Sequence, residues 1–563
     1  MAETEDRCRA ARGASQPARD RVGSTVLGIA AAVVFLLEAA AAGAQEPPAP
    51  APGGAAPGTS PSEAPPAGGP ASYASGPTNA GQAQGPAEGA GREWTITPFV
   101  AATESFTDNA LSTPTQRRAD LISTLSPSIF INGASSRLTG TFSYTPQFIK
   151  YADVTSQDQV LQNLLGNGTL TAIPDLLFFD ANAGITNVAR SGGRGLDNTT
   201  PIATSQNTQT IVYSGSPYLR FRFGDAGTAE LRYFYGQTVF QGNTGATINT
   251  LTGQSLGSIS NSTQQDESAK YSTGEAFNRL QLGVAFDNAT VRSPDSALNS
   301  RDIRGVMNGR YSITRSLQAL FAGGYEKLTY EQQSQLNFSG PTWNFGARFA
   351  PRDDREIVLT YGKSQGRNSF NGTANYALTA GATVSASYSE QTTTQQQQIL
   401  QNLAVATQIT PGVTINSQTG LPQFLANPNL ALQNSIIRTS NFQAGLQLVG
   451  LRNRYTFTFN HSDQSGLSAG ALNQTTNGGL VSWSRDLSPN TSGALTASYS
   501  STNSPGAAVT NNSTDAATLA ISFTFALGPS LDAGASYAVS RQTGGVGGSV
   551  LVDLVSVTLR KTF

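Results

Sequence analysis

The stretch that decides the fold is Val555-Ser556-Val557-Thr558-Leu559-Arg560-Lys561-Thr562-Phe563, at the carboxyl end of the sequence. Apolar and polar side chains alternate along it, which is the period of a two-faced strand. The apolar face consists of Val555, Val557, Leu559 and Phe563. No helix or second sheet follows to cover that face. We therefore expect a lipid bilayer to cover it, as in a transmembrane β-barrel.

An aromatic residue at the end of an alternating strand is typical of Gram-negative outer-membrane β-barrels, whose assembly machinery recognises such an end. We therefore interpret Val555, Val557, Leu559 and Phe563 as an assembly signal. Lys561 interrupts the apolar face at a position where an aromatic is common. We expect its side chain to reach the lipid headgroups near the periplasmic interface.

The composition excludes several classes of protein. Charged residues make up 13% of the 563 residues, against about 25% in soluble domains. The 35 Lys and Arg nearly balance the 36 Asp and Glu, so nothing indicates nucleic-acid binding. Cys8 is the one cysteine and His461 the one histidine, which argues against Cys-ligated zinc and His-rich metal sites. We expect no enzyme activity and no cofactor.

The first 91 residues predict export and a tether. Arginines precede an apolar run at residues 26–37, and Ala42-Gly43-Ala44 fits a cleavage site, so residues 1–44 are typical of a signal peptide. A membrane anchor is the alternative, but the run falls short of the roughly 20 apolar residues that span a bilayer. Residues 45–91 are rich in Pro, Ala and Gly and predict a disordered periplasmic linker.

Residues 92–563 predict one large antiparallel transmembrane β-barrel. Alternating segments recur to the end of the sequence, separated in turn by tight turns and by long polar loops. About 21 segments are clear, but an even number is needed if both ends of the barrel lie in the periplasm. A further strand near residues 262–271, with a turn at 272–275, restores parity. We therefore expect about 22 strands, within a range of 18 to 24.

A soluble β-sandwich or β-helix is the alternative fold, since sandwich strands also alternate. The face that carries Phe, Tyr, Trp and Leu is opposed by Thr, Ser, Gln, Gly and Arg, and the spacing continues without a domain break. An aromatic face toward lipid and a polar face toward a lumen account for both features, so the barrel is favoured.

The longest loop, at residues 391–436, leaves two interpretations open. Gln395–Gln398 lead into Ile399, Leu400 and Leu403, a pattern that predicts a short amphipathic helix. Such a loop either folds into the lumen as a constriction or plug, or lies disordered at the surface as Gln-rich segments often do.

Seven arginines fall on the face that we expect to line the lumen: Arg220, Arg222, Arg232, Arg304, Arg310, Arg348 and Arg560. In one interpretation they are solvated wall residues that pair with carboxylates such as Glu230. In the other they form a channel that guides an anionic or heavily hydroxylated solute, because guanidinium groups bind carboxylates and phosphates in a bidentate manner. The first interpretation is favoured.

His461 requires separate consideration, because outer-membrane lipid hydrolases use a His–Ser pair on the outer face of a barrel. The residue two positions on is Asp463 and not a serine, so the spacing of that family is not matched. We expect a non-catalytic histidine near the membrane interface.

The chain resembles the outer-membrane β-barrel proteins associated with PEP-CTERM/exosortase systems, a group of β-barrel porin type. The most specific matches are Thr107-Asp108-Asn109 and Asp120-Leu121-Ile122 with Pro127. Further matches lie at residues 94–98, 175–181, 323–326, 343, 350–352 and 361–362. The resemblance covers residues 94–563. It implies a context of exopolysaccharide synthesis and export, and it supplies no catalytic residues.

The sequence thus predicts a porin-like barrel in the outer membrane of a Gram-negative bacterium that supports passage or export of a polar solute such as exopolysaccharide. Expected partners are outer-membrane lipids, the barrel-assembly machinery, and exopolysaccharide or its export components. The alternative is a structural or adhesin barrel whose long extracellular loops bind surface polysaccharide or cells.

Overall fold

The computed structural model describes residues 94–193, 207–248, 255–294, 296–410, 413–468, 470–504, 513–544 and 548–563. The predicted signal peptide, residues 1–44, and the predicted linker, residues 45–91, lie outside the described residues. The barrel predicted for residues 92–563 is described from Trp94 onward.

Within the described residues, twenty-two strands form one antiparallel sheet. They are β1 (Thr95–Thr107), β2 (Asp120–Ala134), β3 (Leu138–Tyr151), β4 (Gln159–Ile173), β5 (Leu177–Ala189), β6 (Asn207–Arg222), β7 (Gly227–Gly242), β10 (Ser262–Thr273), β11 (Leu280–Arg292), β12 (Ser300–Ser312), β13 (Leu317–Tyr330), β14 (Phe338–Arg352), β15 (Arg355–Ser364), β16 (Arg367–Thr379), β17 (Ala382–Thr394), β20 (Ile436–Val449), β21 (Asn453–Gly466), β22 (Gln474–Ser488), β23 (Thr491–Asn503), β24 (Ser513–Gly528), β25 (Leu531–Gly544) and β26 (Gly548–Thr562).

The remaining elements are short and belong to the connections between these strands. They are α2 (Gln395–Val405), the hairpins β8 (Thr247–Ile248) with β9 (Ser255–Leu256) and β18 (Ala406–Thr410) with β19 (Val413–Asn416), and the 3-10 turns η1 (Thr155–Gln157), η2 (Gly224–Ala226), η3 (Glu275–Phe277), η4 (Ser296–Leu298) and η5 (Ser334–Leu336). Among the described residues, no helix is long and apolar enough to cross a membrane.

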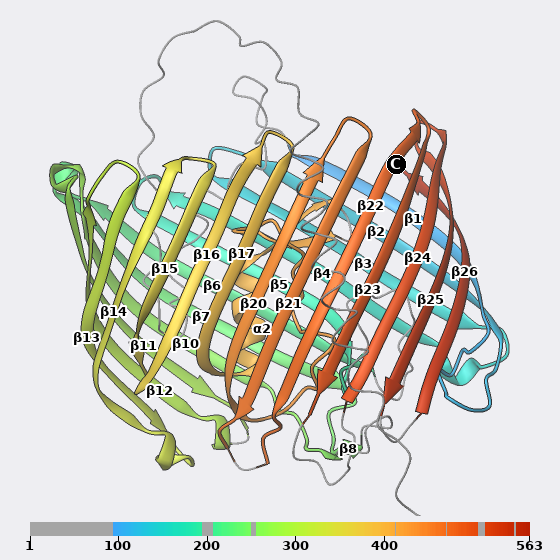
Figure 1. Cartoon of the computed structure of the whole chain (residues 1–563), viewed down its shortest axis with the longest axis horizontal. Coiled ribbons are helices and arrows are strands. Elements are labelled where there is room, and N and C mark those ends of the chain that lie inside the picture. The colour runs from blue at the N-terminus through green and yellow to red at the C-terminus, as the bar shows by residue number, and fades with distance from the viewer. Residues whose placement is uncertain are drawn as a thin grey trace, which may run out of the picture. The chain divides into compact units, whose positions relative to one another are not determined.

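The sheet closes on itself (Figure 1). Each strand pairs with the next one along the chain, and β26 returns to β1, with pairs running from Phe99 and Thr562 to Thr107 and Leu554. Closure leaves no strand edge unpaired, which is what a β-structure needs inside lipid. The predicted number of 22 strands is confirmed, and the additional strand expected near residues 262–271 is β10.

The two ends of the barrel differ in the length of their connections. At one end the strands are joined by short turns, such as the one between β14 and β15. The other end carries the long loops, such as the one between β17 and β20, although β15 and β16 are joined there by a two-residue turn. β1 begins and β26 ends at the end with tight turns. Because outer-membrane barrels have short periplasmic turns and long outer loops, we name these the periplasmic end and the extracellular end.

Side chains alternate between an outer and an inner face along each strand. On β14, Phe345 is 62% exposed and the neighbouring Asn344 is 9% exposed. The same alternation occurs on β26, where Val555, Val557 and Leu559 are exposed and Ser556 is buried. Large apolar side chains on an exposed outer face must contact lipid, because so continuous an apolar surface is unfavourable in water.

The connection between β17 and β20 folds inside the barrel. We name its described residues, 395–410 and 413–435, the luminal loop. Its helix α2 begins with a capping box, in which the Thr394 side chain accepts from Gln397 N while the Gln397 side chain accepts from Thr394 N. Figure 1 shows α2 behind the strands of the front wall. The loop therefore follows the first of the two interpretations, a fold within the lumen.

Candidate functional site: the lumen and its loop

The luminal loop contacts the wall at both ends of the barrel and on opposite sides. α2 lies against β5, β6, β7 and β17, and β18 contacts β3 and β4. Near the extracellular end of β23, the Ser500 hydroxyl donates to Asn429 Oδ1 at 3.0 Å. Near the periplasmic end of β20, Gln447 Nε2 donates to the Gly420 carbonyl at 3.1 Å. The loop therefore narrows the lumen over much of its depth.

An apolar core holds the loop to the wall. It joins Ile399, Leu400, Leu403, Ala406, Leu425, Ala426 and Leu432 of the loop with Ile259 and the wall residues Leu165, Val188, Val212, Phe234 and Phe240. The sequence predicted an inner face rich in Thr, Ser, Gln, Gly and Arg, and this patch of the inner face differs. The difference arises because these wall positions contact protein and not solvent.

Two glycines in the wall allow the close approach of the loop. A Cβ placed on Gly236 would lie 2.5 Å from Leu400 Cδ2, and one on Gly184 would lie 2.6 Å from Leu425 Cδ1. Any larger side chain at these positions would push against the loop, because the barrel wall is fixed by its strand pairing. The two glycines are therefore part of the seat on which the luminal loop packs.

Arg190, just beyond the extracellular end of β5, ties together three connections at the mouth of the barrel. Its Nε donates to the Leu432 carbonyl at 3.2 Å, and its Nη1 donates to the carbonyls of Asn243 and Gly245 at 3.2 Å each. Nη2 donates to the Gly257 carbonyl. Burial lowers the pKa of Arg190 to about 10, so the group stays charged at neutral pH. Sequence reasoning missed this residue, because it lies in a loop.

Charged side chains of the inner face are concentrated on β5 to β15, which we name the charged sector. Away from the strand ends they are Asp180, Glu230, Arg232, Asp266, Lys270, Asp287, Arg304, Glu326 and Arg348. Several are already paired within the wall. Arg304 Nη2 lies 3.4 Å from Asp287 Oδ2, and the fully buried Glu326 accepts from Ser364 Oγ at 3.1 Å and from Gln365 N at 2.8 Å.

The remaining wall, from β16 through β26 and β1 to β4, is the uncharged sector. Outside the three residues at each strand end, the inner positions of these described strands carry no Asp, Glu, Lys or Arg. Hydroxyl pairs span neighbouring strands instead. Ser105 Oγ lies 2.8 Å from Ser556 Oγ, and Thr476 Oγ1 lies 2.9 Å from Thr502 Oγ1. This sector offers donors and acceptors without net charge.

All seven arginines predicted to line the lumen lie on the inner face, but they do not converge on one site. Arg232 is the most enclosed, with Asp180 Oδ2 at 2.8 Å from its Nη1, Glu230 Oε1 at 3.0 Å from its Nε, and the Tyr218 ring 3.8 Å from its Cζ. Arg220 shares Glu230 at 3.2 Å.

The other arginines are spread along and around the wall. Arg222 pairs with Asp175 at 3.3 Å at the exposed periplasmic end, and Arg348 Nε donates to Glu356 at 2.8 Å. The remaining contacts are Arg304 with Asp287, Arg310 with Gln281 and Arg560 over the Phe99 ring. Carboxylate partners already offset most of this positive charge, which leaves less of it for an anionic solute.

Of the residues interpreted as an assembly signal, three lie on the outer face of β26, and Phe563 follows directly after the strand. Val555, Val557 and Leu559 are exposed, and Phe563 is 74% exposed with its amide donating to the Pro98 carbonyl at 3.0 Å. Lys561 shares this face at the periplasmic end and donates to Ser530 Oγ at 2.6 Å.

His461 lies on β21, where its Nδ1 is 2.8 Å from Asn477 Oδ1 of β22. Its neighbours of the same face are Phe459 and Asp463, and Phe442 lies directly across on β20. This setting places a polar partner beside the ring; that His461 lies near the membrane interface stays a prediction. Within the part of the chain that the structure describes, no three His, Cys, Asp or Glu side chains are grouped to hold a metal ion.

This chain resembles known proteins in structure only. No protein-family model matches this chain, and no curated protein matches it. The ferric-catecholate import receptor Fiu from E. coli K12 matches with a TM-score of 0.44 and 7% identity, over 83% of this chain and 82% of that one. The FrpB iron transporter from Neisseria meningitidis matches with a TM-score of 0.44 and 10% identity, over 83% and 82%.

The siderophore receptor PirA from Acinetobacter baumannii is similar at a TM-score of 0.44 and 8% identity, over 84% of this chain and 81% of that one. At such values the likeness carries no argument about what this chain binds. Its class follows from its own geometry.

A closed antiparallel barrel of 22 strands, with an aromatic-rich outer face and a polar lumen, defines an outer-membrane β-barrel of a Gram-negative bacterium. Within that class, this chain is a barrel whose own β17–β20 connection occupies the lumen. β1 begins at the periplasmic end, so the predicted linker joins the barrel on the periplasmic side.

Proposed function

We propose that this barrel supports the passage of a polar, hydroxyl-rich and uncharged solute, such as a segment of exopolysaccharide, through the part of the lumen that the luminal loop leaves open. The observation that carries this proposal is the uncharged sector. Its Ser, Thr, Asn and Gln side chains donate and accept hydrogen bonds as water does, so a sugar can exchange water for wall contacts at low cost.

The charged sector supports the same choice of solute. Its arginines are largely paired with carboxylates, so the wall as a whole offers no continuous positive path for a polyanion. The exopolysaccharide context that the sequence resemblance implies agrees with an uncharged, hydroxyl-rich solute. The luminal loop would act as the constriction that limits passage, because it reaches from the extracellular mouth to Gln447 near the periplasmic end.

Ion conductance in planar bilayers tests this proposal. The full barrel is compared with a variant in which a short Gly-Ser linker replaces residues 395–435. Neutral dextran oligomers and polyanionic oligogalacturonate are then added to each. We expect conductance to rise when the loop is removed, and we expect dextran to reduce the current more than oligogalacturonate does. The matched control removes residues 114–117 from another extracellular loop and leaves the conductance unchanged.

A folded barrel that conducts in neither form would contradict the proposal. If that barrel on intact cells still captured polysaccharide and lost this binding when its extracellular loops were trimmed, the adhesin function would replace it. If the barrel conducts but both oligomers reduce its current equally, the result supports passage and contradicts the preference for uncharged solutes.

A further inference from the structure

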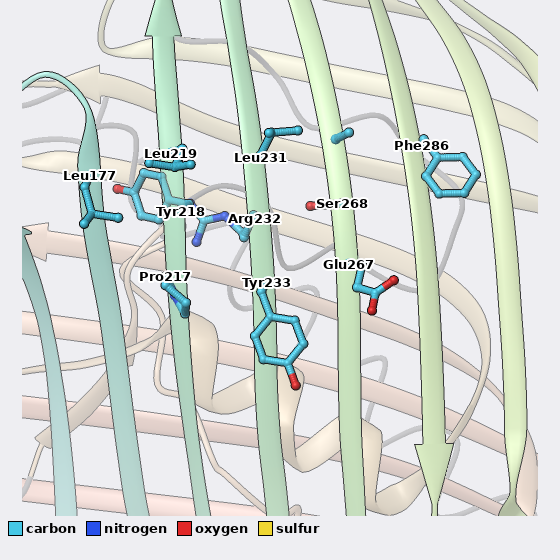
Figure 2. Close-up of a pocket in the computed structure, with 11 residues that line it drawn as sticks. Leu177, Pro217, Tyr218, Leu219, Leu231, Arg232, Tyr233, Glu267, Ser268 and Phe286 are labelled. Atoms are coloured by element: carbon cyan, nitrogen blue, oxygen red, sulfur yellow. The ribbon is translucent and has the colours of Figure 1, made fainter.

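The outer face of the barrel has a hollow on β5, β6, β7, β10 and β11, with a volume of about 480 Å³ (Figure 2). Outward-facing side chains make up most of its lining: Leu177, Pro217, Leu219, Leu231, Tyr233, Glu267, Ala269 and Phe286. The inward-facing residues Tyr218, Arg232 and Ser268 complete it. The hollow faces lipid and not the lumen, so it is separate from the site proposed for passage.

Strand register explains why the hollow is there. Leu177 pairs with Leu219, Leu219 with Leu231, and Leu231 with Ala269, which in turn pairs with Phe286. These residues form one row across five strands on the outer face. Ala269 has only a methyl group between Leu231 and Phe286, so the surface is lower there than on either side. An apolar depression of this kind suits a hydrocarbon chain.

Polar side chains border the hollow on its extracellular side. The next row contains Tyr233, Glu267 and Asn288, and Asn288 Nδ2 donates to Glu267 Oε2 at 3.0 Å. Arg301 Nε donates to Asn288 Oδ1 at 3.0 Å, which extends the hydrogen-bonded chain to β12. Figure 2 shows Tyr233 and Glu267 pointing to the same side, away from Leu231.

Three exposed cations lie on the outer face beyond this border, near the extracellular ends of three neighbouring strands. Arg292 is the last residue of β11, Arg301 is the second residue of β12, and Lys327 lies on β13 directly across from Ile303. We name Arg292, Arg301 and Lys327 the basic triad. Arg301 pairs with Thr290 of β11 and Thr329 of β13, so each triad residue is displaced by two residues along the strand from the next. With strands about 4.8 Å apart and a rise of about 3.4 Å per residue, the triad extends over about 17 Å, a span that suits more than one phosphate group.

We propose that the hollow and the basic triad together bind one diphosphorylated glycolipid of the outer leaflet, with an acyl chain in the hollow and its phosphates on the triad. The occupant follows from position and charge. The triad lies at the extracellular end of the strands, where the outer leaflet of an outer membrane consists of phosphorylated glycolipid. A cationic rim beside an apolar depression complements an amphiphile that has an anionic head and a hydrocarbon tail.

The test uses the full barrel in mild detergent, with bound lipid counted by native mass spectrometry. The probes are diphosphorylated lipid A, its monophosphorylated form and phosphatidylglycerol. One variant fills the hollow, Ala269→Trp, and another removes the charges of the triad, Arg292→Gln with Arg301→Gln and Lys327→Gln. Matched controls are Ala347→Trp, on the same outer face outside the hollow, and Lys561→Gln, on the outer face at the periplasmic end.

We expect each hollow or triad variant to reduce retained diphosphorylated lipid A by at least about tenfold, with little change in the controls. That is the scale of losing charge-assisted hydrogen bonds in the triad variant and of losing buried acyl-chain area in Ala269→Trp. Monophosphorylated lipid A should bind more weakly than the diphosphorylated form, and phosphatidylglycerol more weakly still. Equal retention by all variants, or phosphatidylglycerol binding as tightly as lipid A, would overturn the proposal. A gel shift on boiling verifies that each variant is folded.

Discussion

At the scale of single residues, two buried arginines are satisfied in different ways. Arg232 is held inside the wall by two carboxylates and by the Tyr218 ring, so its charge is compensated. Arg190 has backbone carbonyls as its acceptors, drawn from the β7–β10 and β17–β20 connections. The first arrangement stabilises strand pairing, whereas the second stabilises the position of loops. Their removal should therefore have different consequences.

Arg232→Gln should lower the stability of the barrel itself. Asp180 and Glu230 would lose their common partner while remaining in the wall, which costs about 3 to 5 kcal/mol when a buried pair is broken. The free energy of unfolding in urea, measured in phospholipid vesicles, gives the value. Arg222→Gln is the control, because its pair with Asp175 is exposed and should contribute about 1 kcal/mol or less. Equal effects of the two variants would contradict this account.

Arg190→Met should release the loops at the mouth and leave the strands intact. Carbonyl groups of Leu432, Asn243 and Gly257 would lose a charged donor, which weakens loop docking by about 2 to 4 kcal/mol. Hydrogen exchange should become faster in the luminal loop but not in β23. The exposed Arg117, in another extracellular loop, serves as the control in Arg117→Met. Unchanged exchange in Arg190→Met would show that other contacts hold the loop.

At the scale of elements, the luminal loop and β26 differ in how far the sequence determines them. The alternation of Val555 to Phe563 is local, so both the strand and its outer face could be predicted. The Leu400 and Leu403 pattern predicted a helix, but not its place. That place depends on Val212 and Phe234, which are far away in the sequence and reach the loop only when the barrel closes. Long-range contacts of this kind leave no signal in one sequence.

The hollow beside Ala269 could not be predicted for a similar reason. An alanine on an outer face is unremarkable by itself, and the depression appears only when Leu231 and Phe286 are brought beside it by register. The strand β10, by contrast, was found through parity, although its inner face carries Asp266 and Lys270 and its alternation is weak. The predicted arginines lie on the inner face, and Glu230 was expected as a partner, but the sequence could not show which arginines pair with carboxylates and which, such as Arg310 and Arg560, have other partners.

Gly236→Val should displace α2 while leaving the wall in place. A Cβ added at this position would lie 2.5 Å from Leu400 Cδ2, and the two methyl groups of valine would force the helix to shift. Hydrogen exchange in residues 395–405 should rise, with the exchange of β7 unchanged. Gly323→Val is the matched control, because no atom lies within 4 Å of a Cβ at Gly323. If α2 is equally protected from exchange in both variants, Gly236 does not determine how α2 packs against the wall.

Phe563→Ala should impair assembly in cells but not the stability of the folded barrel. The Phe563 side chain is 74% exposed and adds little to packing within the protein, so its loss should act on recognition by the assembly machinery. The amount of heat-modifiable protein in the outer-membrane fraction should fall severalfold, while refolding from urea into vesicles proceeds as before. If the variant assembles normally in cells, Phe563 is not part of an assembly signal.

At the scale of the whole molecule, closure and the two faces of the sheet together explain location. Pairing of β26 with β1 satisfies the backbone hydrogen bonds of both strands and leaves no free sheet edge. The aromatic and aliphatic side chains of the outer face then contact lipid. A barrel of 22 strands encloses a wide lumen. The luminal loop fills part of it. The division of the wall into charged and uncharged sectors becomes visible only at this scale.

The most direct test of this account places a fluorescent label at single cysteines on neighbouring positions of β26, Val557→Cys and Thr558→Cys, each with Cys8→Ser. The barrel is refolded into vesicles that contain a nitroxide-labelled lipid, and aqueous iodide is the second quencher. We predict quenching at position 557 by the lipid nitroxide and not by iodide, and the reverse at position 558. Quenching at position 557 by iodide, with position 558 shielded from both quenchers, would contradict the assignment of the apolar face to lipid.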